Sequence, residues 1–397
     1  MVDDDVDILI VGGGLIGAML VLALASTGIR CLLVDTHDPS ARLNVDFDSR
    51  SIALSAASVR IFNMLNIWQI IQEDTTAIDT IHISEQRRFG SAILQANLDE
   101  SLGYVVELST IHKALAKSLK RSDILAPATV TGFDPTSRIT TIDTVSGEKK
   151  IRAKLIVAAD GANSCMRRFC GMRCEIKDYP HVALVANVGI ARHHQYIAYE
   201  RFTPTGPLAL LPMNDLRMAM VWSLLPEDAD RLAHTSDKSF LQALQLAFGY
   251  RLGRFVKVGR RMTYPLRQVF MPQLVKDTVV FIGNAAHTLH PVAGQGFNLG
   301  LRDVAMLAQC VTQHGLSKEM LHHYQQARHH DQSAITRFTD SLVELFTNKH
   351  PGLALARTVG LMTLDNSVLL KTMISRYARG FAGVIPDLVC EIPLKEI

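Results

Sequence analysis

Three glycines near the N-terminus, spaced as GxGxxG, form a pattern that can hold a phosphate group. Gly12, Gly14 and Gly17 follow the β-rich run Asp7–Val11 and open the apolar stretch Leu15–Ser26, which has the composition of a helix. Gly12 permits a tight turn, Gly14 lets a pyrophosphate approach the backbone, and Gly17 lets the helix pack on the strand. Because the first N–H groups of a helix are unpaired and its N-terminus is positive, phosphates are favoured there. The spacing predicts a dinucleotide site.

This unit continues into a second apolar run that ends at an acidic residue. Cys31–Val34 is followed by Asp35, about twenty residues after the glycines. A carboxylate in this position accepts hydrogen bonds from a ribose diol, which favours an adenosine without a 2′-phosphate. Because NAD and FAD proteins share this fingerprint, it leaves the choice between the two cofactors open.

Two later segments place polar residues at the ends of predicted buried strands. Asp160 follows Leu155–Ala159, and Asn284 follows Thr278–Ile282 after one glycine. Open α/β sheets bind ligands outside the carboxyl ends of their strands, so we expect both side chains beside the N-terminal glycine turn. Since these strands lie far along the chain from the first unit, the nucleotide-binding domain must be discontinuous.

Together these motifs resemble those of the class A flavoprotein monooxygenases, the para-hydroxybenzoate hydroxylase family. Residues 159–167 resemble the family's DG motif, and residues 283–303 resemble its GD motif and the helix that follows. The order and spacing of all three motifs agree over nearly the whole chain. The resemblance implies an α/β fold, in which a discontinuous Rossmann-like FAD-binding domain carries an inserted antiparallel β-sheet substrate domain and a C-terminal helical segment.

The pattern of strands predicts the domain boundaries. Residues 80–95 have the pattern of a hairpin and residues 181–265 that of alternating strands, so we assign both to the substrate-binding sheet. The FAD-binding domain then comprises residues 1–79, 96–180 and 266–341, and residues 342–397 form the C-terminal helical segment.

The resemblance implies bound FAD, with NADPH or NADH as a transient reductant and O2 as co-substrate. The expected FAD-binding residues are Gly12, Gly14, Gly17, Asp35, Arg50, Asp160, Asn284, Gly294, Gly296, Phe297 and Asn298. Most relatives have aspartate in place of Asn284, whose amide keeps an acceptor for a ribityl hydroxyl but not the charge. Gly294 and Gly296 lead into an apolar helix whose free N–H groups can stabilise negative charge on reduced flavin.

Further segments narrow the substrate. Residues 200–212 (ERFTPTGPLALLP) are similar to the flavin-facing strand of the ubiquinone-biosynthesis hydroxylases. Residues 284, 339–342 and 361–363 resemble the branch that acts on 2-polyprenyl-6-methoxyphenol as a 4-hydroxylase. The resemblance implies that a flavin C4a-hydroperoxide, shielded from water, delivers oxygen to the ring carbon para to the phenol.

Two other functions and the identity of the base stay open at this point. A hydroxylase for another ring position of the same pathway and a non-catalytic FAD-binding subunit of the biosynthetic complex are the alternatives. A phenol-activating base should exist, but Tyr199, His181 and His287 are equivalent candidates, so no catalytic residue is assigned.

The composition excludes several other classes of protein. Apolar residues make up 48% and charged residues 20%, and a net charge of +3 without a basic run argues against nucleic acid as a partner. The six cysteines form no CxxC pair and the histidines no HExxH, so we predict no metal. The uncharged run Ile8–Ile29 is long enough to span a bilayer, but three glycines interrupt it. We therefore predict an intracellular protein that does not span a membrane.

The end of the chain mixes apolar residues with scattered basic ones between Pro351 and Val389. Such helices can lie on a bilayer surface or pack against a partner, and they can equally cover the FAD-binding domain or a subunit interface. A polyprenyl phenol is almost insoluble in water, so the enzyme must take it from a membrane or a partner. We expect a cytoplasmic protein, and leave open a peripheral contact with the inner face of the cytoplasmic membrane, association with other ubiquinone-biosynthesis proteins, and the oligomeric state.

Overall fold

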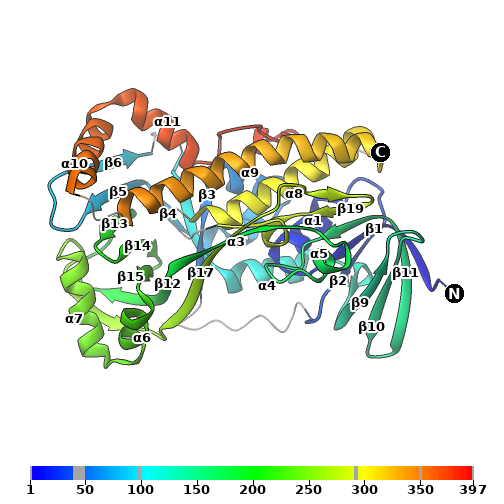
Figure 1. Cartoon of the computed structure of the whole chain (residues 1–397), viewed down its shortest axis with the longest axis horizontal. Helices are drawn as coiled ribbons and strands as arrows, with labels where there is room; N and C mark the ends of the chain where they lie inside the picture. The colour runs from blue at the N-terminus through cyan, green and yellow to red at the C-terminus, as the bar shows by residue number, and fades with distance from the viewer. Residues whose placement is uncertain (1, 39–49, 97–99, 290–293, 348–350, 396–397) are drawn as a thin grey trace.

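The computed structural model describes residues 2–38, 50–96, 100–289, 294–347 and 351–395 (Figure 1). It contains two large β-sheets at opposite ends of the molecule, connected by long helices and a small third sheet. The small sheet has the order β3 (Ser51–Ser55), β7 (Gly103–Glu107) and β4 (Thr76–Ile78).

The eight-stranded sheet contains the predicted βαβ unit. Its main path runs in the order β18 (Val275–Lys276), β19 (Val279–Phe281), β11 (Gly147–Ala158), β1 (Asp4–Val11), β2 (Cys31–Val34) and β8 (Ile124–Leu125), and β9 (Ala128–Asp134) and β10 (Ile139–Thr144) extend β11. β1 pairs in parallel with both β2 and β11, and β11 pairs in parallel with β19. The predicted strands near residues 7, 155 and 278 therefore lie side by side, as expected from their apolar runs.

The uncharged N-terminal run is confirmed as a strand, a turn and a helix. It divides into β1, a glycine turn and α1 (Leu15–Leu24), which ends two residues before the predicted Ser26. Ile8, Leu9 and Ile10 are fully buried because a parallel sheet is covered on both faces. Among the described residues, none of the helices combines the length and the apolar character needed to cross a bilayer.

The nine-stranded sheet is formed by segments far apart in the sequence. Its order is β20 (His287–Thr288), β17 (Met262–Phe270), β12 (Glu175–Ile190), β15 (Arg217–Leu224), β14 (Gly206–Met213), β13 (Ile197–Thr203), β5 (Thr80–Glu85) and β6 (Ser91–Gln95), with β16 (Phe255–Val258) beside β12. The predicted hairpin is present, since β5 and β6 pair antiparallel. β12 starts at Glu175 and β17 ends at Phe270, several residues outside the range 181–265.

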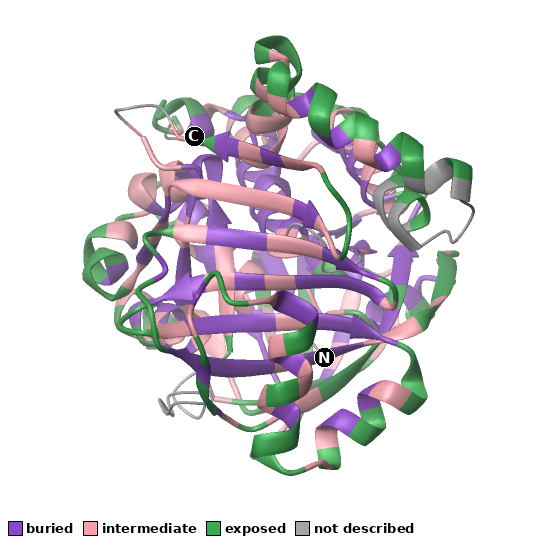
Figure 2. Ribbon diagram, turned by 90° about the vertical axis from the view of Figure 1, so that its left-hand side faces the viewer, coloured by how far each residue is buried: buried purple, intermediate pink, exposed green. Residues whose placement is uncertain are grey.

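The two faces of this sheet pack against different elements, and Figure 2 shows buried and half-buried residues along its strands. One face packs under α6 (Pro226–His234) and α7 (Asp237–Phe248), where Leu208, Leu210 and Trp222 are buried. The other face carries a row of side chains in register across the strands, most of them half-buried. We call this the half-buried row: Ile83, Glu200, Ala209, Val221, Val185 and Met262.

The remaining helices connect the two sheets. α8 (Gln295–His314) packs between α1 and α9 (Lys318–Thr347), and α9 reaches over β14 of the nine-stranded sheet (Figure 1). α2 (Ala56–Met64), α3 (Trp68–Ile71) and α4 (Leu108–Ser118) follow strands of the small sheet or each other, and α5 (Cys165–Phe169) follows β11.

The C-terminal segment is partly buried against the rest of the protein and partly exposed. α10 (Pro351–Asn366) lies against β6, with Leu361 and Leu364 buried, and α11 (Val368–Ala378) follows it. Beyond α11, Leu388 and Val389 are buried in the core of the eight-stranded sheet domain. The chain end is therefore part of the main core, whereas the outer surfaces of α10 and α11 are exposed.

Candidate functional site

The carboxyl ends of β1, β11 and β19 bring the three predicted motifs to one edge of the eight-stranded sheet. The Ala159 N–H donates to Val11 O at 2.8 Å, and the Ile282 N–H donates to Ala158 O at 3.0 Å. Gly283 lies against Ile16 of α1, since a Cβ built at Gly283 would be 3.1 Å from that side chain. Segments about 120 to 270 residues apart thus meet at one edge, where open α/β sheets bind ligands.

Gly12 and Gly17 are required by the close packing of this turn. Gly12 has a φ of +108°, and a Cβ there would overlap the carbonyl oxygen of Ala159. A Cβ at Gly17 would overlap the carbonyl oxygen of Gly12. Any larger residue at either position would push the start of α1 away from the strands.

Gly14 and Gly296 differ from these glycines because open space lies in front of them. A Cβ at either position would have no atom within 4 Å. Gly14 is the N-cap of α1 and Gly294 the N-cap of α8, and neither helix start has a side-chain cap or an acidic residue in its first turn. Two helix N-termini with no capping side chain therefore begin at this edge, which suits an anionic ligand.

Asp35 lies beside the glycine turn, buried at the end of β2. Its carboxylate accepts the N–H of Gly13 at 2.6 Å and the N–H of His37 at 2.7 Å. These bonds hold the carboxylate in place near the helix start.

Asp160 has one side-chain oxygen with a protein partner and one without. Its Oδ2 accepts the Met166 N–H at 3.1 Å, whereas Oδ1 is buried with no hydrogen-bond partner. Arg167, also buried, donates to Ala285 O at 3.3 Å and to Ala162 O, which ties the DG segment to the turn after β19. An unpaired buried carboxylate oxygen is unusual in proteins, so it suits a ligand with a donor such as a hydroxyl.

Asn284 is exposed in the short 3₁₀ turn η4 (Gly283–Ala285). The turn is held from below by Asp303 of α8, whose Oδ2 accepts the Gly283 N–H at 2.9 Å and the His287 Nε2 at 2.7 Å. The other oxygen of Asp303 accepts Arg328 Nε at 2.7 Å and Gln332 Nε2 at 2.9 Å. Asn284 is therefore presented at the sheet edge by a buried network that joins α8, α9 and the turn.

The Asp303 carboxyl keeps its negative charge although the side chain is fully buried. Burial alone would raise the pKa of the Asp303 carboxyl, but His287 and Arg328 beside it hold that pKa well below its usual range. Arg328 is fully buried and also pairs with Asp331, which accepts a hydrogen bond from Arg302 at 2.7 Å. A charged group with this many partners is a rigid support for the turn.

The other predicted residues lie around the start of α8, in different environments. Asn298 uses its whole amide within the protein: Oδ1 accepts Ser55 N and Ser58 Oγ, and Nδ2 donates to the carbonyls of Ala53 and Gly294. Phe297 is half-buried against Phe62, with ring centroids 6.3 Å apart. Arg50 is exposed, and its guanidinium lies 5.9 Å from the centroid of the Tyr264 ring. The Asn298 side chain thus positions α8 against β3.

The half-buried row lies on the face of the nine-stranded sheet that packs against the small sheet. On that face, Ala198, Leu211 and Ala219 belong to an apolar cluster that includes Ala53 of β3. A Cβ at Gly294 would be 3.4 Å from the Ala53 side chain. The start of α8 and the half-buried row therefore border the same region of the molecule.

The three candidates for a base are not equivalent in the structure. His287 is fully buried against Asp303, and Tyr199 is buried on the opposite face of the sheet, edge-on to Phe248. His181 lies where the pairing of β12 with β17 shifts register. Sequence reasoning overlooked Glu200, the one acid in the half-buried row, although the alternation along β13 places it opposite to Tyr199.

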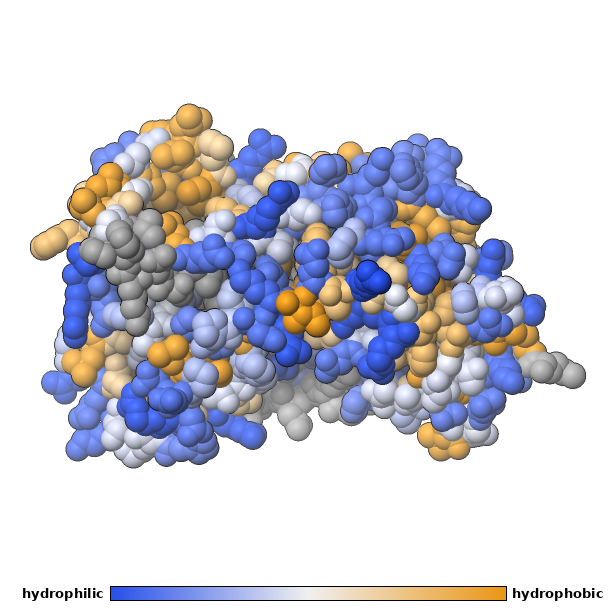
Figure 3. Space-filling model, in the orientation of Figure 1, coloured by the Kyte–Doolittle hydropathy of each residue, from blue (hydrophilic) through white to orange (hydrophobic). Residues whose placement is uncertain are grey.

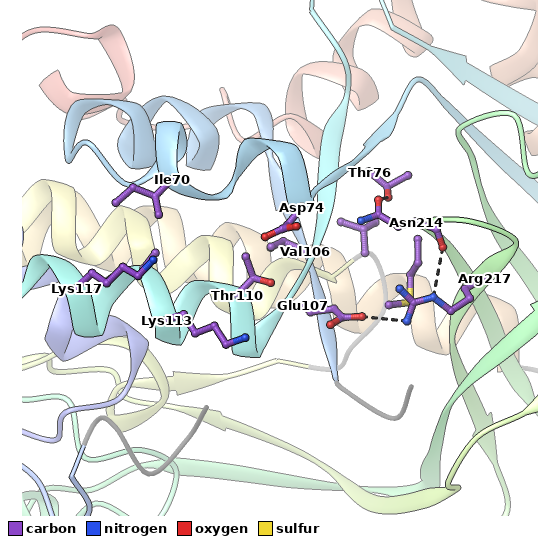
Figure 4. Close-up of a pocket in the computed structure, with 13 residues that line it drawn as sticks. Ile70, Asp74, Thr76, Val106, Glu107, Thr110, Lys113, Lys117, Asn214 and Arg217 are labelled. Carbon is purple, nitrogen blue, oxygen red and sulfur yellow. Dashed lines mark hydrogen bonds and ion pairs between the residues drawn. The ribbon is translucent and has the colours of Figure 1, made fainter. Parts of the chain in front are cut away.

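A separate polar pocket of about 360 Å³ lies between α3, α4 and the turn after β14 (Figure 4). Its lining includes Lys113, Lys117, Asp74 and the ion pair of Glu107 with Arg217, whose N···O distance is 3.1 Å. Such a lining does not suit an apolar ring, so we do not place the substrate there.

The described residues contain one group of side chains with the geometry to hold a metal ion: His314, Glu319 and His323. His314 is the last residue of α8, about 30 Å from the helix start. The spacing of these three residues is not that of an HExxH motif, and the group is remote from the sheet edge.

Comparisons with known proteins agree with this arrangement. The family model described as FAD binding domain matches residues 5–339. The chain is 33% identical to the ubiquinone hydroxylase UbiL of Rhodospirillum rubrum, over 97% of this chain and 92% of that protein. It is 30% identical to the 3-demethoxyubiquinol 3-hydroxylase of Escherichia coli, over 96% of this chain and 100% of that protein.

A solved structure shares the fold. The p-nitrophenol 4-monooxygenase PnpA of Pseudomonas putida superposes with a TM-score of 0.78 at 17% identity, covering 96% of this chain and 99% of that one. Because the family model spans most of the chain and the relatives match over nearly their full length, the chain belongs to the FAD binding domain family, as an FAD-dependent aromatic monooxygenase.

Proposed function

We propose that this enzyme hydroxylates 2-polyprenyl-6-methoxyphenol at the ring carbon para to the phenolic hydroxyl, as a step of ubiquinone biosynthesis. The observation that carries the proposal is the half-buried row, an apolar face with one acid that borders the start of α8. A face of this kind suits an aromatic ring with a hydrocarbon substituent. The names of the UbiL and E. coli relatives place those proteins in ubiquinone metabolism, which supports the pathway.

We assign FAD to the edge of the eight-stranded sheet. Gly12, Gly14 and Gly17 would accommodate the pyrophosphate at the start of α1, and Asp35 the adenosine ribose. Along the ribityl chain and the ring system we place Arg50, Asp160, Asn284, Gly294, Gly296, Phe297 and Asn298. The open space at Gly14 and the unpaired Asp160 Oδ1 both fit this cofactor.

The chemistry divides between cofactor and protein. When bound, FAD would supply the redox chemistry with O2, with NADPH or NADH as the reductant. The protein's own contribution is to orient the ring on the half-buried row and to exclude water with the apolar side chains around it. The N-terminus of α8, which has no capping side chain, would favour negative charge on a flavin ring bound beside it.

Hydroxylation at another ring position is the second candidate, because the E. coli relative is named for a 3-hydroxylase. Both candidates can be tested with two one-isoprene analogues, 2-prenyl-6-methoxyphenol and the corresponding demethoxyubiquinol. We expect NAD(P)H-driven O2 uptake and a para-hydroxylated product with the first analogue alone. Product from the demethoxyubiquinol alone would favour the second candidate, and failure to convert either would contradict the proposed function.

We further propose that the outer surface of α10 and α11 touches a membrane, from which the substrate is taken. Figure 3 shows apolar side chains gathered over these two helices. The most exposed are Leu355, Val359, Val368, Leu369 and Met373, with exposed fractions of 53–80%. A cluster of apolar residues this exposed is typical of a surface that binds something.

Three of the basic residues of this segment argue for apolar insertion rather than for attraction to anionic lipid. Lys371 pairs with Asp365 at 2.8 Å, Arg357 pairs with Glu85 at 2.8 Å, and Arg379 pairs with Glu100. Since these cations already have acidic partners, they add little to binding by surface charge.

Vesicle co-sedimentation tests this contact. We expect the full chain to bind phosphatidylcholine vesicles, and added anionic lipid or salt to change binding little. Replacing Val368, Leu369 and Met373 by serine together should abolish binding, whereas Leu246→Ser, an 82% exposed leucine of α7, serves as control. Unchanged binding of the triple variant would remove this surface as the membrane contact. Substitution is preferable to truncation because Leu388 and Val389 belong to the main core.

A further inference from the structure

Glu200 occupies the centre of the half-buried row. It pairs in register with Ile83 on one side and with Ala209 on the other, and Val221 and Val185 continue the row. Since side chains alternate along a strand, Ala198 and Phe202 are its neighbours on the same face of β13. Every side chain beside Glu200 in the sheet is therefore apolar.

The carboxyl group of Glu200 has no partner for one of its oxygens. Oε1 is buried and accepts no hydrogen bond, and no hydrogen bond or ion pair of Glu200 occurs among the described residues. Burial raises the pKa of the Glu200 carboxyl to about 7, with no charged neighbour contributing. The residue as a whole is half-buried, so Glu200 lies at the border of the packed core.

The charged groups around this position are already paired. On the same face, Glu85 of β5 pairs with Arg357 of α10, and Asp365 of α10 pairs with Lys371 of α11. On the opposite face, Arg201 donates to Ala247 O at 3.0 Å and to Ser84 Oγ at 3.3 Å. Of these three acids, Glu200 is thus the one for which the described residues supply no partner, a costly arrangement unless a ligand supplies one.

We propose, building on the proposed function, that Glu200 is the base that removes the proton of the substrate's phenolic hydroxyl. The phenolic O–H bond breaks, and the proton bonds to a carboxylate oxygen of Glu200. The electron pair of the broken O–H bond stays on the phenol oxygen. The negative charge of the phenolate raises electron density at the ring carbon that receives the oxygen. A carboxyl with a pKa near the working pH is suited to such a transfer, because it is partly ionised yet basic enough to accept a proton.

The geometry favours Glu200 over the residues with comparable chemistry. Tyr199, its neighbour in β13, lies on the face covered by α7, and His287 is buried against Asp303. Neither side chain borders the half-buried row. Of the six residues that form the half-buried row, Glu200 is the one with a titratable side chain, and the row borders the start of α8.

The test compares Glu200→Gln with wild type and with Tyr199→Phe, on the FAD-loaded protein. Glutamine has the same shape but cannot take the proton. With 2-prenyl-6-methoxyphenol as probe, we expect kcat of Glu200→Gln to fall about 100- to 10,000-fold while FAD content is unchanged. Tyr199→Phe should retain kcat within about twofold, since its side chain faces away.

The pH dependence and the ionisation of the bound probe separate a catalytic role from a structural one. Because the carboxylate is the active form, kcat of wild type should rise with pH through about 7, and this inflection should vanish in Glu200→Gln. A chlorinated probe that is already ionised at pH 7 should reduce the difference in kcat between the two proteins to less than about tenfold.

Three results would overturn the assignment: equal kcat of Glu200→Gln and wild type, the same inflection in both, or a kcat of wild type that does not rise with pH through about 7. The last result is measured on wild type alone, so it counts even if the variant folds poorly. If wild type converts no phenol at all, the proposed function itself fails. If wild type converts the phenol but one of the three results above is obtained, only the Glu200 assignment fails.

Discussion

Replacing Asp303 by asparagine should loosen the turn that presents Asn284. The carboxylate accepts four hydrogen bonds, two on each oxygen, from Gly283, His287, Arg328 and Gln332. Asparagine keeps one acceptor oxygen but directs an NH2 group at the donors on the other side. Two donors then lose their partner, and the fully buried Arg328 loses one of its two carboxylates. Breaking a buried ion pair in this way costs about 3–5 kcal/mol.

The cost should be visible as a loss of thermal stability. For a chain of this length it corresponds to a fall in Tm of about 4–6 °C, measured by calorimetry of the FAD-loaded proteins. Asp228→Asn is the control, because Asp228 forms an exposed pair with Arg231 in α6 that should contribute at most about 0.5 kcal/mol. A fall of less than about 1 °C for Asp303→Asn would refute the view that this network supports the turn.

The effect should also depend on pH in a defined direction. The pKa of the Asp303 carboxyl is lowered in the folded protein, so its stabilising contribution is complete above the unfolded value of about 4 and is lost as pH falls through the folded value. The difference in Tm between wild type and Asp303→Asn should therefore stay constant from pH 8 to about pH 5 and shrink only under more acidic conditions. A difference that shrinks between pH 8 and 6 would point to another group.

Other substitutions test the cofactor assignment. Gly14→Val should leave Tm of the apo-protein nearly unchanged, because a Cβ at this position would meet no atom within 4 Å, yet abolish FAD retention; a variant that retains stoichiometric FAD would contradict the placement. Gly17→Ala should destabilise the apo-protein itself, since its Cβ would overlap the Gly12 carbonyl, and an unchanged Tm would argue against this packing. In titrations of apo-protein with FAD, Asn284→Leu should weaken binding by about 1–3 kcal/mol and Asn284→Asp should bind normally, whereas equal affinity of Asn284→Leu and wild type would refute a ribityl contact.

The nucleotide-binding half was predictable from sequence because its signals are local. A strand, a glycine turn and a helix within residues 4–24 form one continuous unit, and Gly12 and Gly17 are required by contacts within or next to that unit. The later motifs at Asp160 and Asn284 could be assigned to the same edge because parallel strands direct their carboxyl ends alike.

Other features depend on which surfaces pack together, and no local pattern carries that information. Alternation along β13 places Glu200 and Tyr199 on opposite faces, but only the packing of α7 on one face decides which residue lies at the border of the packed core. The side chain of Asn298 joins α8 to residues more than 240 positions earlier in the chain, a contact that no local pattern indicates.

The C-terminal segment shows the same division between sequence and tertiary structure. Its apolar composition was evident, but composition cannot distinguish a buried residue from an exposed one. Leu388 is buried in the main core and Leu369 is exposed, although both are leucines of one apolar segment. The difference arises because hydrophobic burial depends on the surface that a neighbouring element offers, and that surface forms only when distant parts of the chain fold together.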